Sequence, residues 1–326
     1  MNRVTSLIAL FLLVVSLNAH ANYSERSDVQ AFIDEMVEKH GFARETLMSQ
    51  FASAKRLDGV LEAIAKPAEK VLTWKEYRPI FITAKRISRG NEFLQENRET
   101  LMRAEKEFGV PAEIITAIIG VETFYGRLSG KTQVFDSLVT LGFDYPPRAR
   151  FFRSELEQYL LLTREENVDV RDIQGSYAGA MGMPQFISSS YRHYAVDFDG
   201  DGKRDLWNNT VDVIGSVANY FKVHGWEPGG QVVVPARINA HMKDEIEETR
   251  NNLKPHTLIA DMTNNGIYPE VEVDNSLKAT LVTLEGDNGK EYWLGLDNFY
   301  VITRYNHSAL YAMAVYQLSL EFDTQK

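Results

Sequence analysis

The chain contains a nearly continuous apolar run that ends in a carboxylate, Pro111-Ala-Glu-Ile-Ile-Thr-Ala-Ile-Ile-Gly-Val-Glu-Thr-Phe-Tyr-Gly126. Apolar residues on all sides predict a buried helix, with Pro111 in its first turn and Gly126 beyond its end. Glu122 then lies in the last turn, where burial and the negative end of the helix dipole both raise the pKa of a carboxyl group. A raised pKa suits a general acid at neutral pH. The alternative is a surface Glu at a fraying helix end.

A second segment is rich in small residues, Gly175-Ser-Tyr-Ala-Gly-Ala-Met-Gly-Met-Pro-Gln-Phe186. Glycine and alanine allow a backbone to approach a ligand closely, so this segment predicts one wall of a cleft of sugar size. One carboxylate beside such a wall points to cleavage of a glycan.

The composition limits the class of protein. The 326 residues carry a net charge of −10, no Cys and 44% hydrophobic residues, which is ordinary for a globular chain with two or three subdomains. The lack of Cys excludes disulfides, thiolate metal sites and a Cys nucleophile. The acidic charge argues against nucleic acid as a partner. The sequence has no Gly-rich phosphate loop, and we expect no organic cofactor.

The first 21 residues are typical of an export signal. A basic start and a short apolar stretch precede the small-x-small site Ala19-His20-Ala21, which predicts a mature, soluble protein from Asn22. A retained signal anchor is the alternative, although the apolar stretch is short for a membrane span.

Changes of pattern divide the rest of the chain into segments. Helical, amphipathic periodicity predicts a helical subdomain over residues 22–95, and alternating helices and loops predict the catalytic core over residues 96–230. Residues 231–296 predict a small β-rich subdomain, and residues 297–326 a segment that returns to the core. The expected fold class is therefore α+β, mainly α.

Finer features are predicted within these segments. Asp287-Asn288-Gly289 predicts a hairpin turn, and the β-branched run from Phe299 to Thr303 predicts a strand. Asn306-His-Ser308 is a good cap for a last helix from Leu310 to Phe322. The aromatic segment Trp74 to Phe81 serves either packing between helices or sugar stacking, and the residues leave both open.

The segment Asp197-Phe-Asp-Gly-Asp-Gly-Lys-Arg-Asp205 matches a calcium loop over most of its length. The carboxylates of Asp197, Asp199 and Asp201 occupy the first, third and fifth positions, a Gly the sixth, the carbonyl of Lys203 the seventh and an Asp the ninth. The twelfth position is an Asn where a bidentate Glu is expected, so Asp212 is the candidate for the last ligand. The alternative is an Asp/Gly turn that binds nothing specific.

On these segments the chain resembles the lytic murein transglycosylase B family of exported bacterial peptidoglycan-cleaving enzymes. The resemblance covers nearly the whole mature sequence and is carried by Val121–Arg127 with Gly130–Thr132, Gly175–Gly182 with Gln185 and Phe186, the Asp197 loop with Ile214–Tyr220, His224–Trp226, and Thr303–Ser308. Several family members are lipoproteins. Because this chain lacks the lipid-bearing Cys, it resembles a soluble periplasmic form.

The resemblance implies a goose-lysozyme-like catalytic core with Glu122 as the sole acid/base. Glu122 would protonate the glycosidic oxygen between N-acetylmuramic acid and N-acetylglucosamine, while the muramic N-acetyl group stabilises the developing cation. The ionised Glu122 would then take the C6 hydroxyl proton, which closes a 1,6-anhydro ring without water. Two-carboxylate glycosidases need a second acidic group that this mechanism does without.

The resemblance also implies a set of residues that bind the substrate. Ser176 would orient the N-acetyl group, and the remaining contacts would come from Gln185, Phe186, Tyr305, Asn306, Tyr77 and Arg148. Family members often carry a basic pair after Tyr-Pro, whereas this chain reads Tyr145-Pro-Pro-Arg148. Bound calcium would be structural.

Two other functions stay open at this point. A hydrolytic muramidase would let water attack the same intermediate, and a non-catalytic, calcium-stabilised protein would only bind peptidoglycan. In each case the expected partners are peptidoglycan glycan strands, with other cell-wall enzymes as further candidates, and a monomer is expected.

Overall fold

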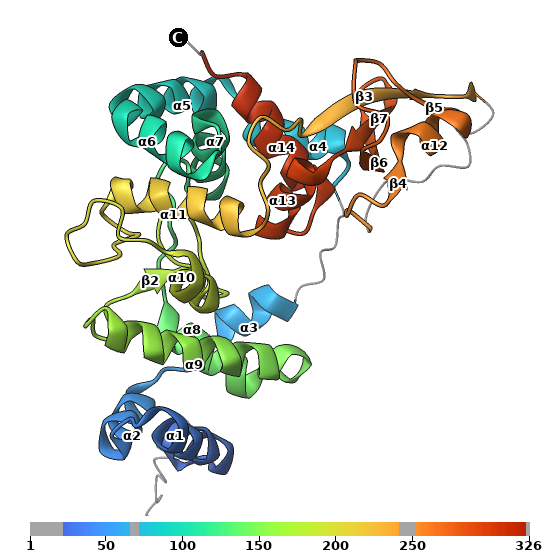
Figure 1. Ribbon diagram of the computed structural model, residues 1–326. Helices are drawn as coiled ribbons and strands as arrows, with labels where there is room; N and C mark the ends of the chain where they lie inside the picture. The colour runs from blue at the N-terminus through green and yellow to red at the C-terminus, as the bar shows by residue number, and fades with distance from the viewer. Residues whose placement is uncertain (1–21, 66–71, 241–251, 324–326) are drawn as a thin grey trace, which may run out of the picture. The chain divides into compact units, whose positions relative to one another are not determined.

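The computed structural model describes residues 22–65, 72–240 and 252–323 (Figure 1). The chain forms two compact units, Met1–Leu57 and Asp58–Lys326. The expected signal peptide, residues 1–21, lies outside the described residues. Within the described part of the chain, no helix is both long and apolar enough to cross a membrane.

The smaller unit is helical. It contains the 3-10 turn η1 (Tyr23–Glu25) and the helices α1 (Ser27–His40) and α2 (Arg44–Ser53). The buried rings of Phe32 and Phe51 join the two helices edge to face, with centroids 6.0 Å apart. The helical segment predicted over residues 22–95 therefore does not form one unit, because its second half belongs to the larger unit.

The larger unit is built around α7 (Ala112–Thr123), which corresponds to the apolar run of the sequence. Helices α5, α6, α11 and α14 all pack against α7, and this explains why its sequence is apolar on all sides. The unit also contains one 3-10 turn, two short strands and further helices, in the order α3 (Asp58–Ala65), α4 (Trp74–Phe81), α5 (Ala84–Glu96), α6 (Arg98–Phe108), β1 (Thr132–Gln133), α8 (Val134–Asp144), η2 (Pro146–Arg148), α9 (Ala149–Glu165), β2 (Gln174–Gly175), α10 (Ser188–Tyr194), α11 (Thr210–Val223), α13 (Asp297–Tyr305) and α14 (Ala309–Leu320).

A five-stranded antiparallel sheet occupies the predicted β-rich segment. Its strand order is β4-β6-β7-β3-β5, and α12 (Ile259–Asn264) packs beside it. The strands are β3 (Val233–Ile238), β4 (Thr257–Leu258), β5 (Ile267–Pro269), β6 (Lys278–Gly286) and β7 (Gly289–Gly295). The predicted hairpin is confirmed, since Gly286 pairs with Gly289, which has the positive φ of 101° that the turn requires.

The strand predicted from Phe299 to Thr303 is wrong. These residues lie in α13, which packs on β7 and α14. Phe299 and Ile302 are three residues apart and both fully buried, so a helix places them on one face against the core. This packing overrides the strand propensity of a β-branched run.

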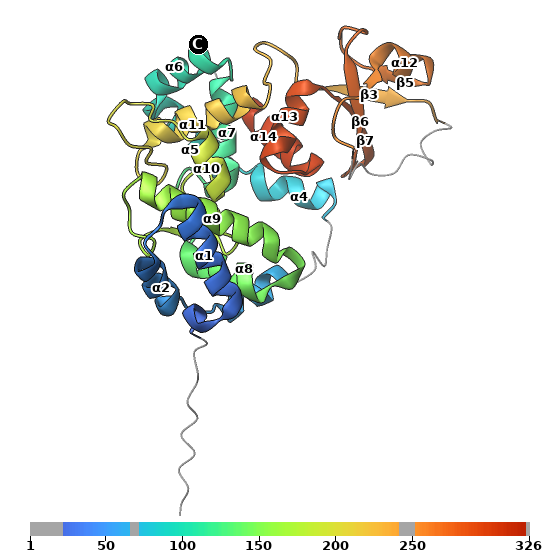
Figure 2. The same cartoon turned by 60° about the horizontal axis from the view of Figure 1, so that its bottom comes forward.

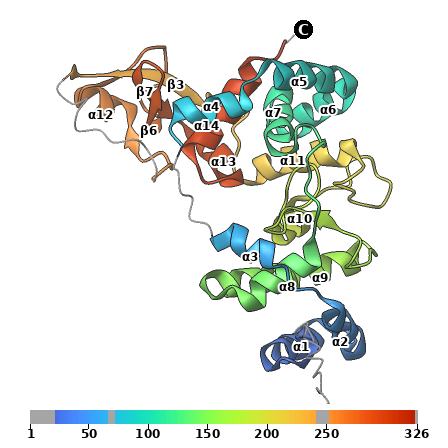
Figure 3. The same ribbon diagram turned by 180° about the vertical axis from the view of Figure 1, so that it is seen from behind.

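The last predicted helix is confirmed as α14, and Ser308 caps it by accepting a hydrogen bond from the N–H of Tyr311 at 3.3 Å. Helices α4, α13 and α14 lie together beside the sheet, with α4 against β6 (Figure 2). In the view from behind, α8 and α9 lie side by side, with α3 against α8 (Figure 3). The expected class, α+β and mainly α, is confirmed.

Candidate active site

Glu122 lies in the last turn of α7, as predicted, and the helix ends abruptly after it. Phe124 and Tyr125 have positive φ angles of 51° and 59°, followed by Gly126 at 81°. A left-handed conformation costs a residue with a side chain about 1–3 kcal/mol, and such strain is concentrated at functional sites. The chain therefore tolerates two strained residues immediately after this carboxylate.

Three tyrosines surround the carboxyl group of Glu122. The hydroxyl of Tyr311 donates to Glu122 Oε1 at 2.6 Å. Burial raises the pKa of Tyr77 to about 12 and raises that of Tyr305 as well, and the negative charge of Glu122 adds to both shifts. Both tyrosines therefore lie near the carboxylate. These tyrosines come from three helices, since Tyr77 lies on α4, Tyr305 on α13 and Tyr311 on α14.

Burial in this aromatic surrounding raises the pKa of Glu122 to about 7, and the hydrogen bond from Tyr311 opposes part of that rise. The side chain keeps partial exposure, so it reaches solvent and a ligand can reach it. The desolvation predicted for Glu122 is thus present, and the carboxyl group can exchange a proton near neutral pH.

The small-residue segment lies beside the turn that follows α7. The strand β1 pairs with β2, with Thr132 opposite Gly175. A Cβ at Gly130 would lie 2.1 Å from the carbonyl oxygen of Gly175, so the two backbones meet in van der Waals contact. The two segments quoted from the sequence therefore form neighbouring parts of one region.

Ser176 is partly exposed in this segment, and its hydroxyl oxygen accepts hydrogen bonds from the N–H groups of Ala178 and Ala180 at 3.3 and 3.0 Å. An oxygen that accepts two backbone N–H groups is held in place while its own proton can be donated elsewhere. Ser176 is therefore oriented as a hydrogen-bond donor.

Gln185 has a positive φ of 52°, and its amide nitrogen donates to the carbonyl oxygens of Ser129 and Gly182 at 3.1 and 2.9 Å. These two bonds hold the side chain and tie the loop after α7 to the small-residue segment. The structure buries Phe186, which is 2% exposed and packs against the rings of Tyr220 and Tyr305. Phe186 supports Tyr305, whose hydroxyl donates to Pro184 O at 2.6 Å.

Two residues of the predicted set are exposed. Asn306 follows Tyr305 at the end of α13. Arg148 lies in η2 with its guanidinium 4.4 Å from the ring centroid of Phe151. Neither has a described contact with Glu122.

Tyr311 is the site residue that the sequence did not reveal. A single Tyr in an apolar helix is most often a core residue whose hydroxyl finds a local partner. The weak signal was its position within the helix that follows Tyr305 and Asn306, two residues already assigned to the site.

The Asp-rich loop brings three carboxylates together. Ligand atoms of Asp197, Asp199 and Asp212 all lie within 4.8 Å of one another. Asp212 is fully buried, and its two oxygens accept the N–H groups of Phe198 and Asp205 at 2.7 and 2.9 Å. Oxygen donors of this kind and spacing fit a calcium ion, and Asp212 joins the cluster as predicted.

Asp201, also predicted as a ligand, is not part of that cluster of carboxylates. The carbonyl of Lys203 stays a predicted ligand. The carboxylate of Asp201 accepts the N–H of Lys203 at 2.9 Å, and its own N–H donates to Asp197 and Asp199. The loop thus uses Asp201 for its internal turn, because a short Asp side chain readily accepts the N–H two residues ahead.

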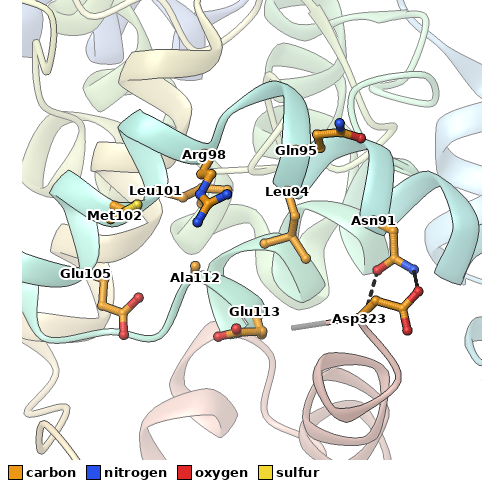
Figure 4. Close-up of a pocket in the computed structure, with 10 residues that line it drawn as sticks. All are labelled: Asn91, Leu94, Gln95, Arg98, Leu101, Met102, Glu105, Ala112, Glu113 and Asp323. Atoms are coloured by element: carbon orange, nitrogen blue, oxygen red, sulfur yellow. Dashed lines mark hydrogen bonds between the residues drawn. The ribbon is translucent and has the colours of Figure 1, made fainter. Parts of the chain in front are cut away.

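A cavity of about 580 Å³ lies at the other end of α7 (Figure 4). It is lined by Ala112 and Glu113 from the start of α7, by residues of α5 and α6, and by Asp323. It contains none of the predicted site residues, so it is separate from the surroundings of Glu122.

The chain belongs to the transglycosylase SLT domain family, whose model matches residues 24–320. It is 45% identical over 306 residues to the membrane-bound lytic murein transglycosylase B of Escherichia coli (strain K12), covering 91% of this chain and 83% of that protein.

Solved structures give the same family. The lytic transglycosylase SltB1 of Pseudomonas aeruginosa matches with a TM-score of 0.88 and 53% identity, over 92% of this chain and 98% of that one. The lytic transglycosylase Slt35 of E. coli, solved in complex with calcium, matches with a TM-score of 0.82 and 46% identity, over 90% of this chain and 91% of that one. The family predicted from the sequence is confirmed, and the lysozyme-like core agrees with these structures.

Proposed function

We propose that this protein is a peptidoglycan lytic transglycosylase. It cleaves the β-1,4 bond between N-acetylmuramic acid and N-acetylglucosamine and leaves a 1,6-anhydromuramic acid end. Membership of the family supports the reaction class, and the surroundings of Glu122 support the mechanism. The observation that carries the proposal is a carboxyl group with a pKa of about 7 among three tyrosines.

In this mechanism Glu122 acts first as acid and then as base. Its proton goes to the glycosidic oxygen, and the bond from that oxygen to C1 of the muramic acid breaks. The carbonyl oxygen of the 2-acetamido group attacks C1 in its place, and the hydroxyl of Ser176 donates to this group and orients it. Glu122 then removes the proton of the C6 hydroxyl, whose oxygen closes the anhydro ring on C1 and releases the acetamido oxygen.

A second carboxylate is not required, because the substrate supplies the internal nucleophile. Among the described residues, burial and Tyr311 are what shift the pKa of Glu122, with no contribution from another acid. This supports a single acid/base and agrees with a site without a water-activating partner.

The other cleft residues bind and hold the sugar. The amide nitrogen of Gln185 already donates to two carbonyl oxygens. Its Oε1 is therefore the atom that accepts a hydrogen bond from a sugar hydroxyl. Tyr305, Tyr77 and Asn306 line the approach to Glu122, and Phe186 acts through Tyr305. Arg148, exposed in η2, contacts glycan or peptide at the edge. A structure of SltB3 from Pseudomonas aeruginosa in complex with NAG-NAM-pentapeptide supports a glycan substrate that carries stem peptides.

Asp197, Asp199 and Asp212 would hold a calcium ion. The ion would supply positive charge that binds the loop to the first turn of α11, and it takes no part in the steps above. The calcium complex of Slt35 supports this metal. We further propose that the mature protein is a soluble periplasmic monomer, with other cell-wall enzymes as candidate partners.

The mass of the products tests the proposal. Purified murein sacculi are digested with the mature protein, and the released muropeptides are analysed by mass spectrometry. Anhydro ends, which are one water lighter than reducing ends, are expected. Reducing ends would instead show a hydrolytic muramidase. Binding to sacculi without any release would show a protein that only binds peptidoglycan.

A further inference from the structure

Arg86 joins the ends of the two helices that carry Tyr77 and Glu122. Its Nη1 donates to the carbonyl oxygens of Ile80 and Phe81, at the end of α4, at 2.6 and 3.1 Å. Its Nε donates to the carbonyl oxygen of Gly120, in the last turn of α7, at 3.1 Å. The carbonyl oxygens of Gly120 and Phe81 also accept the N–H groups of Phe124 and Thr83, each at 3.1 Å. A cation at a helix C-terminus offsets the negative end of the dipole.

The side chain that makes these bonds is half-buried and lies near two aromatic rings. The guanidinium carbon of Arg86 lies 5.1 Å from the ring centroid of Phe81 and 5.2 Å from that of Phe124. Partial burial lowers the pKa of Arg86 from its usual value. A planar fork with several N–H groups can reach carbonyls of two helices at once, which the single ammonium of a Lys cannot do.

Tyr125 holds the backbone of Arg86 in turn. Its hydroxyl donates to the carbonyl oxygen of Arg86 at 2.9 Å. Two glycines make room for this contact, because a Cβ at Gly90 or at Gly120 would each lie 2.6 Å from the Tyr125 hydroxyl. The strained turn after Glu122 therefore contains Tyr125, whose side chain packs closely against Gly90 of α5 and Gly120 of α7.

We propose that Arg86 and Tyr125 are positioning residues for the transglycosylase reaction. Together they fix the end of α4 near the end of α7 and so hold Tyr77 close enough to Glu122 for the charge of the carboxyl group to act on it. Neither residue contacts the reacting atoms. The proposal rests on the proposed function, since it assigns these residues a role only through Glu122.

The test compares Tyr125→Phe and Arg86→Lys with Tyr159→Phe in the mature protein. Tyr159 makes a matched bond, in which its buried hydroxyl donates to the carbonyl oxygen of Val170 at 2.8 Å, and it lies on α9. The melting temperature, kcat and KM are measured on a soluble glycan of alternating N-acetylglucosamine and N-acetylmuramic acid, with kcat followed across pH.

Tyr125→Phe should lower kcat about tenfold and Arg86→Lys more, since misplacing a reacting group by about 1 Å costs up to roughly a hundredfold. KM should change less than about twofold. The alkaline limb of kcat should move to lower pH, because a loosened Tyr77 lets water reach Glu122 and lowers its pKa toward the ordinary value. Tyr159→Phe should lower the melting temperature by a similar amount with kcat and the alkaline limb unchanged.

If Tyr125→Phe and Arg86→Lys match Tyr159→Phe in kcat and in pH profile, while Glu122→Gln is inactive, the positioning role is overturned and the proposed function stands. If Glu122→Gln keeps full activity, both proposals fall together.

Discussion

Glu122 and Asp212 are both carboxylates whose pKa is raised by burial, yet they lie at opposite ends of their helices. Glu122 is in the last turn of α7, where its carboxyl group accepts a hydrogen bond from the hydroxyl of Tyr311. Asp212 is in the first turn of α11, where each of its oxygens accepts a backbone N–H. The backbone donors cannot turn away, whereas a hydroxyl can rotate when the carboxyl group takes a proton.

The difference fits the two roles proposed for these carboxylates, proton transfer for Glu122 and metal binding for Asp212. Fixed N–H donors and a helix N-terminus favour the charged form, which suits the proposed role of Asp212 as a cation ligand with Asp197 and Asp199. A single rotatable partner and a helix C-terminus leave the charged form poorly stabilised. This suits a carboxyl group that must give up a proton and take one back.

The largest expected effect is that of Glu122→Gln on turnover. Gln keeps the size of the side chain but carries no titratable proton, so kcat should fall by about three to four orders of magnitude while glycan binding is kept. Glu113→Gln is the matched control, because it alters a carboxylate in the first turn of the same helix and should keep kcat within about twofold. Retention of more than about a tenth of wild-type turnover in Glu122→Gln would remove its role as acid/base.

Asp212→Asn should have the next largest effect, on stability. The Asn amide would place N–H groups against the N–H of Phe198 or Asp205, and metal binding would weaken, at a cost of about 2–4 kcal/mol. Calcium should raise the melting temperature of the wild type and leave this variant unchanged. Asp201→Asn should keep most of the calcium shift. Equal shifts in wild type and Asp212→Asn would contradict the three-carboxylate site.

Glu122→Gln should also change how stability depends on pH. The folded pKa of about 7 lies above the ordinary 4.5, so the stabilisation linked to this proton is complete below pH 4.5 and is lost as pH rises through 7. The wild type should lose about 2–3 kcal/mol from this group by pH 8, and the Gln variant should not. Urea unfolding of both at pH 5 and pH 8 measures the difference. If the free energies of unfolding of the wild type and of Glu122→Gln differ by the same amount at pH 5 and pH 8, Glu122 has an ordinary pKa in the folded protein.

Tyr311→Phe should have the smallest effect of the series. Its hydroxyl favours the charged form of Glu122, so its removal should raise the pKa further and move the alkaline limb of kcat to higher pH by up to about one unit. Turnover at neutral pH should change by less than about tenfold. Tyr316→Phe, on the same helix α14, serves as the control and should leave the limb in place. A limb that moves to lower pH would mean that Tyr311 does not act on Glu122 as a donor.

Local patterns predicted much of this site. The apolar run predicted α7 and the position of Glu122, and the Asp spacing predicted the carboxylate loop with Asp212 as the replacement ligand. Contacts across long stretches of chain were beyond such patterns. Tyr311 reaches Glu122 across 189 residues, and the helix from Phe299 to Thr303 depends on packing against the core rather than on propensity. The burial of Phe186 against Tyr220 and Tyr305 is likewise set by neighbours that the sequence does not place.

The pKa of Glu122 tests the central claim most directly. The mature protein with carbon-13 in its Glu carboxyl groups is titrated by NMR, and the Glu122 signal is assigned by its absence in Glu122→Gln. A midpoint near 7 is expected, since burial among the tyrosines disfavours the charged form. A midpoint near the ordinary 4.5 would contradict the account, because the carboxyl group would then be ionised at neutral pH and unable to start the reaction as an acid.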